Sequence, residues 1–75
     1  MQTWLIVADA GIKFGWGYVD SIFEDDGVLG NRCSLTRHRT EAKKFVCTRN
    51  EILFIINTIK PYAPKYTLTP QEYNP

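Results

Sequence analysis

Few side chains in this sequence are of the kinds that carry out covalent chemistry. The chain has one histidine, His38, and two cysteines, Cys33 and Cys47. The nucleophile that these residues suggest is a thiolate paired with the imidazole, which the positive charges of Arg37 and Arg39 would favour. A cysteine in an apolar strand is more often a small core residue, and no carboxylate stands near His38 in the sequence to orient it. We therefore expect no catalytic residue.

The ligand sets of metals and phosphate-bearing cofactors are missing too. The cysteines lack the CxxC spacing of a zinc site, which needs four ligands or three and a water. No glycine-rich loop of the GxGxxG or GxxxxGK[ST] type is present. Asp25 and Asp26 precede Gly27, and Asp-Gly is typical of a tight turn rather than of an acid and base pair. The sequence thus predicts a binding protein without metal or cofactor, and not an enzyme.

One set of candidate binding residues combines aromatic anchors with an acidic turn. Trp16 and Tyr18 are of the residue types that dominate protein interfaces. Glu24, Asp25 and Asp26 present three carboxylates in succession, which can mimic phosphates toward a host protein that normally binds nucleic acid. Our first hypothesis is that the chain binds and blocks a host protein through these five residues.

The alternative hypothesis is a nucleic-acid-binding protein. Its phosphate contacts would come from the basic part of the chain, and Trp16 and Tyr18 would stack on bases. The formal net charge of only +1 and the acidic first part of the chain weigh against it. The basic candidates are Arg32, Arg37, Arg39, Lys43, Lys44 and Arg49.

Charge is segregated along the chain. Residues 1–31 hold five carboxylates and one lysine, whereas residues 32–49 hold six cations and one carboxylate. The two segments either neutralise each other within the fold or present two opposite patches to partners. We favour internal neutralisation, because charges of opposite sign are usually interspersed on a folded surface.

Length and hydropathy limit the class of protein. Seventy-five residues provide one small domain, and so small a domain can gain core by forming a homodimer. The longest apolar runs, residues 4–8 and 52–56, are far shorter than the roughly 20 residues that cross a bilayer. With so few cysteines, we expect a cytoplasmic protein with no membrane partner.

The strands are predicted mainly in the first half of the chain. The apolar run at residues 3–10 predicts a central strand buried on both faces. Aromatic residues then alternate through Phe14, Trp16 and Tyr18, which predicts a strand over residues 12–18 whose aromatic face lies mostly in the core. One helix cannot cover both sides of a sheet, so some aromatic surface should stay exposed. A hairpin turn at Asp26 and Gly27 and a strand over residues 32–37 follow.

The second half predicts the principal helix. Residues 40–44 predict one helical turn. Thr48 and Glu51 have the spacing of a capping box, and isoleucines 52, 55, 56 and 59 form one apolar stripe that Leu53 and Phe54 widen. Pro61 ends the helix, residues 66–69 form a last strand that stops at Pro70, and residues 71–75 form a frayed tail. The expected fold is α+β, a small antiparallel sheet of three to five strands with one principal α-helix packed on one face.

Residues 40–45 (TEAKKF), the helix that follows and the Tyr66-Thr-Leu-Thr-Pro70 ending resemble small proteins encoded by bacteriophages and prophages. The similarity covers about residues 36–70. This chain departs from the pattern at Ile52 and Leu53 and in its Gly-Trp-Gly segment. The resemblance implies a phage accessory protein, a group that includes inhibitors of bacterial defence such as anti-CRISPR proteins, and it supplies no functional residue.

Overall fold

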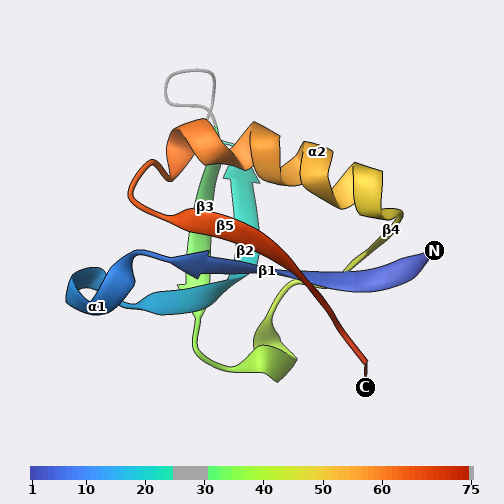
Figure 1. Cartoon of the computed structure of the whole chain (residues 1–75), viewed down its shortest axis with the longest axis horizontal. Coiled ribbons are helices and arrows are strands. Elements are labelled where there is room, and N and C mark those ends of the chain that lie inside the picture. Colours follow the sequence, from blue (N-terminus) through green and yellow to red (C-terminus); the bar gives the residue numbers. More distant parts are fainter. Residues whose placement is uncertain (25–30, 75) are drawn as a thin grey trace.

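A five-stranded antiparallel sheet and one long helix make up the fold (Figure 1). The computed structural model describes residues 1–24 and 31–74. The strands are β1 (Gln2–Asp9), β2 (Trp16–Glu24), β3 (Asn31–Thr36), β4 (Phe45–Cys47) and β5 (Thr67–Glu72). The helix is α2 (Arg49–Ile59), and the short helical segments are α1 (Gly11–Phe14), η1 (Arg39–Glu41) and η2 (Lys60–Tyr62). The expected α+β class is confirmed.

Strand β1 is the centre of the sheet, as its apolar run predicts. Its residues 7–9 pair with both β2 and β5, and Trp4 pairs with both β4 and β5. A strand has only two edges, so β2 and β4 share one edge of β1 and β5 occupies the other. Strand β3 pairs with β2 and extends the sheet on that side.

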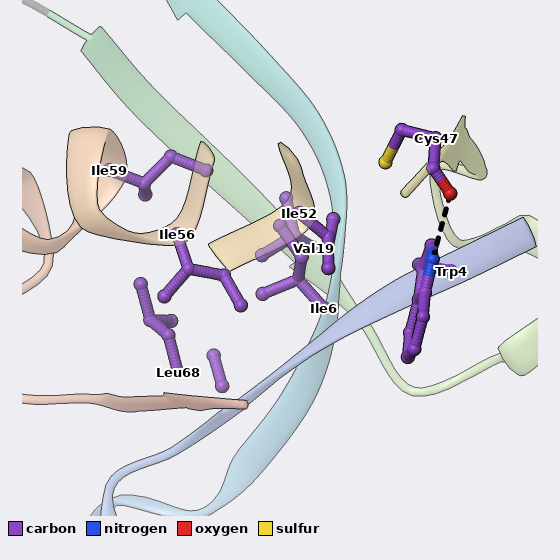
Figure 2. Packing of buried hydrophobic residues seen from close by; sticks show 9 residues of the cluster. Trp4, Ile6, Val19, Cys47, Ile52, Ile56, Ile59 and Leu68 are labelled. Carbon is purple, nitrogen blue, oxygen red and sulfur yellow. Dashed lines mark hydrogen bonds between the residues drawn. The ribbon is translucent and has the colours of Figure 1, made fainter. Parts of the chain in front are cut away.

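The core lies between the sheet and α2. Trp4, Ile6 and Ala8 alternate along β1 on the face that α2 covers, and they are at most 4% exposed. Figure 2 shows the helix residues Ile52, Ile56 and Ile59 directed toward this face, with Val19 and Leu68. The indole N–H of Trp4 donates to the carbonyl of Cys47 at 3.1 Å, which satisfies the polar atom of this buried side chain.

The start of α2 is set by the predicted capping box. The Thr48 hydroxyl accepts from the backbone N–H of Glu51 at 3.2 Å, and the Glu51 carboxylate accepts from the backbone N–H of Thr48 at 3.1 Å. The apolar stripe is confirmed, with Ile55 partly buried beside it. Leu53 and Phe54 do not widen the stripe, because their side chains are 37% and 73% exposed.

The strand predicted over residues 12–18 is wrong in its first half. Gly11–Phe14 forms the single helical turn α1, and β2 begins only at Trp16. The Asp9 carboxylate accepts from the Gly11 N–H at 2.8 Å, and Gly11 and Gly15 have positive φ angles. The β1–β2 hairpin therefore turns where the alternation of aromatic residues suggests continuous strand.

The hairpin of β2 and β3 is confirmed by its pairing, from Tyr18 opposite Thr36 to Glu24 opposite Asn31. The strand predicted over residues 32–37 is found at Asn31–Thr36. The predicted turn at Asp26 and Gly27 lies outside the described residues. The helical turn predicted over residues 40–44 is the shorter η1.

The end of the chain differs from its prediction, because β5 continues through Pro70 to Glu72. The backbone N–H of Tyr73 donates to the Thr3 carbonyl at 2.9 Å, which makes Thr3 and Tyr73 a hydrogen-bonded pair. Hydrogen-bonded pairs alternate along an antiparallel ladder, so the nitrogen of Pro70 faces away from β1. A proline is tolerated in an edge strand in this orientation, and the predicted frayed tail from residue 71 is wrong for residues 71–73.

Candidate binding face

The side of the sheet opposite α2 carries the exposed anchor that the sequence suggests. The register places Trp16 beside Asp9 and Tyr18 beside Val7, on the face that Trp4, Ile6 and Ala8 do not use. We call this side the open face. It consists of Thr3, Leu5, Val7, Asp9, Trp16, Tyr18, Thr67, Thr69, Gln71 and Tyr73. Leu5, in the middle of β1, is 0% exposed, so the face is covered at that position, as the prediction of a strand buried on both sides implies.

Trp16 is the most exposed aromatic residue described on the open face, at 43%. Its ring meets the partly buried ring of Tyr18 edge to face, with centroids 5.4 Å apart and an angle of 85° between the planes. The guanidinium carbon of Arg37 lies over the Trp16 ring, 5.4 Å from its centroid. The predicted burial of Trp16 in the core is wrong, because α2 covers only the other face.

Gly15 makes room for this arrangement. Its φ angle is +81°, and a Cβ atom at this position would lie 2.8 Å from a terminal guanidinium nitrogen of Arg37. The missing side chain therefore lets Arg37 approach the backbone next to Trp16. A shallow hollow of about 390 Å³ lies here, lined by Asp9, Gly11, Ile12, Gly15, Trp16 and Arg37.

Tyr73 lies at the other end of the open face and also contacts cations. The guanidinium carbon of Arg39 is 4.6 Å from its ring centroid, and the Lys44 ammonium is 5.1 Å from it. The same ammonium donates to the carbonyls of Thr40 at 2.8 Å and Ala42 at 3.1 Å. Sequence reasoning missed Tyr73 because it follows Pro70, and only its pairing with β1 reveals it.

The cations of residues 37–44 form what we call the basic loop, namely Arg37, Arg39, Lys43 and Lys44, all exposed. Lys43 lies 5.7 Å from the ring centroid of Phe45. Glu41, the carboxylate within the loop, accepts a hydrogen bond from the Thr36 hydroxyl at 3.2 Å. The described contacts of Arg37, Arg39 and Lys43 are with aromatic rings, which gives no support to internal neutralisation by the acidic segment.

The rest of the basic set lies elsewhere. Arg32 is paired with Phe23 toward the far end of β2, and Arg49 is the first residue of α2. The structure therefore places Arg37 at one end of the open face and Arg39 and Lys44 at the other, and it puts Arg32 and Arg49 away from both ends. The side chain of Arg32 is outside the described part of the chain.

Glu24, the first residue of the acidic set, has its backbone at the opposite end of β2 from Trp16. Eight residue steps from Trp16 to Glu24 correspond to about 26 Å in an extended strand. Asp25, Asp26 and the side chain of Glu24 lie outside the described residues. Of the five residues of the first hypothesis, the structure describes the side chains of Trp16 and Tyr18, which are in contact with each other.

The surroundings of the Cys47 thiol are unfavourable for a nucleophile. Cys47 is free and buried. Its burial, and secondarily the charge of Glu51, raise the pKa of the Cys47 thiol above its ordinary value, which disfavours the thiolate at neutral pH. His38 is exposed, and the side chain of Cys33 is not among those described. Within residues 1–24 and 31–74, no three histidine, cysteine or acidic side chains gather in a group fit to hold a metal ion.

No protein-family model, curated protein or solved structure matches the chain. None of the helices in the described ranges is long and apolar enough to cross a membrane.

Proposed function

We propose that this protein binds nucleic acid, without catalysis, on the open face and the adjoining basic loop. The observation that carries the proposal is the placement of Arg37 on Trp16 and of Arg39 and Lys44 on Tyr73. Nucleic-acid-binding sheet surfaces combine aromatic rings, on which bases stack, with nearby cations that contact phosphates.

The low net charge does not oppose this proposal once the fold is taken into account. Trp16 and Glu24 lie at opposite ends of β2, about 26 Å apart along the extended backbone. The Debye length at physiological ionic strength is about 8 Å, so charges separated by that length of strand are largely screened from one another. The local field at Arg37 and Arg39 therefore depends mainly on nearby charges, namely the cations of the basic loop, Glu41 within it and Asp9, which lines the hollow beside Arg37.

Charge reversal tests the proposal. In fluorescence anisotropy with labelled oligonucleotides at low salt, we expect the double variant Arg37→Glu and Arg39→Glu to lose binding, because it replaces two cations of the basic loop by carboxylates. Arg49→Glu is the matched control, since it makes the same change in charge away from the open face. Equal loss in both variants would mean that only net charge matters and would contradict a site on the open face.

A second candidate is the first hypothesis from the sequence, binding and inhibition of a host protein, such as the defence proteins that phage accessory proteins target. The observation in its favour is the fully exposed Ile12, which lines the same hollow as Trp16 and Arg37. Apolar surface next to tryptophan and arginine is the composition of interface hot spots.

The acidic turn distinguishes the two candidates. Changing Glu24, Asp25 and Asp26 to lysine should abolish binding to a host protein that the carboxylates contact. The same change should strengthen nucleic-acid binding at low ionic strength, about 0.01 M, where the Debye length reaches about 30 Å, and change it little at physiological salt. The measurement is the affinity of this triple variant for nucleic acid and for any host protein retained from a nuclease-treated bacterial lysate.

A further inference from the structure

We infer that the open face selects single-stranded over double-stranded nucleic acid, by stacking an unpaired base on Trp16. This inference rests on the proposed function. It adds that the ligand is single-stranded and that Trp16 is the residue that distinguishes a single strand from a duplex. The key observation is that the Trp16 ring is 43% exposed and is held by two neighbours, Tyr18 in a T-shaped contact and Arg37 over its ring.

The orientation of Trp16 is restrained before any ligand arrives. The edge-to-face contact with Tyr18 restricts rotation of the indole, and Gly15 admits the guanidinium that lies over it. A ring held in place loses little conformational entropy on stacking. Arg37 can then contact the phosphate next to the stacked base, because its side chain is exposed.

The bases of a duplex cannot stack on the Trp16 ring unless the duplex is distorted. Its base faces already stack on one another, and an aromatic side chain reaches them only by unstacking a step. A single strand offers free base faces, and every base has one, so recognition by Trp16 should tolerate sequence.

The extent of the face limits the ligand to a short stretch of strand. Trp16 lies opposite Asp9 on β1, and Tyr73 lies opposite Thr3. Asp9 and Thr3 are six residues apart, so the two aromatic residues are separated by about 20 Å along the strand. The cations that the described residues place along this face are the four of the basic loop and Lys65, which lines a hollow with Val7, Thr67 and Thr69. The slope of log affinity against log salt should therefore be no steeper than about −3.5 for a single strand that contacts all five.

The test compares an oligothymidine with the same strand annealed to its complement, by anisotropy and by tryptophan emission. We expect the single strand to bind at least about tenfold more tightly and to quench the emission of Trp16. Trp4 is 4% exposed, so its emission supplies a constant background. Trp16→Phe measures that background and, since it keeps a ring, should retain most of the affinity.

The variant Trp16→Ala should weaken single-strand binding about tenfold and weaken duplex binding by a clearly smaller factor, so that the preference for the single strand is lost. Phe54→Ala is the matched control, because Phe54 is an exposed aromatic residue on α2, which covers the other face. Circular dichroism verifies that each variant is folded.

The outcomes separate this inference from the proposed function. Equal affinity for single strand and duplex, without quenching, overturns the inference and leaves binding by the basic loop intact. No binding of either form at low salt overturns both and favours a protein as the ligand of the open face.

Discussion

At the scale of single residues, Gly15 and Gly11 are a matched pair in the turn between β1 and β2. Both have positive φ angles, +81° and +82°. A Cβ atom at Gly11 would meet nothing within 4 Å, whereas a Cβ atom at Gly15 would meet Arg37. The two glycines therefore share a conformational role, and Gly15 alone is coupled to the open face.

This difference predicts distinct effects of alanine. Gly15→Ala and Gly11→Ala should each destabilise the fold, by on the order of 1–3 kcal/mol, because each puts a side chain in a region that favours glycine. Only Gly15→Ala should also displace Arg37 from Trp16 and lower the affinity for single-stranded oligonucleotide. Thermal unfolding and anisotropy measure the two effects. A loss of affinity in both variants would show that the turn as a whole, rather than the arginine, supports binding.

At the scale of elements, α2 depends on its cap and on its packing against the sheet. The helix is rich in isoleucine, which has modest intrinsic helix propensity, so the capping box and the buried isoleucines must stabilise it. The hydrogen bond from the backbone N–H of Thr48, and secondarily that with the Thr48 side chain, lower the pKa of Glu51 below its ordinary value of 4.5.

The capping box predicts a pH-dependent contribution to stability. A carboxyl group with a lowered pKa in the folded state stabilises the protein above its unfolded pKa, and this contribution is lost as the pH falls through the folded pKa. The Tm of Glu51→Gln should therefore lie below that of the unmodified protein near neutral pH, and the two should converge once the pH falls below the folded-state pKa of Glu51, where both side chains are neutral. A constant difference in Tm across the acid range would contradict this role for the Glu51 charge.

At the scale of the whole molecule, the edge of the sheet at β5 is poorly suited to strand-to-strand association. Pro70 has no N–H, and its nitrogen faces the outer edge, so the row of donors along that edge is interrupted. The sequence predicts that so small a domain can gain core by association, and a homodimer would more readily use another surface.

We expect a substitution that restores the missing backbone N–H at position 70 to promote association through this edge. Pro70→Val adds an outward N–H and should increase dimer formation in sedimentation velocity at high protein concentration. Thr69→Val is the control, because the N–H of Thr69 faces β1 and the substitution adds apolar surface without an edge donor. Equal dimerisation of both variants would attribute association to apolar surface and contradict the role of the proline.

The features of this protein that the sequence determined by itself are those that depend on residues close together in the chain. The capping box of Thr48 and Glu51, the isoleucine stripe and the apolar run of β1 are local patterns with direct physical consequences, and together they predict the α+β fold. Tertiary structure decided the rest. The contacts of Trp16 with Arg37 and of Tyr73 with Arg39 join residues far apart in the sequence, and they depend on strand register and on which face α2 covers. Local spacing carries no information on either, so the basic loop and the aromatic rings became one candidate site only in the folded chain.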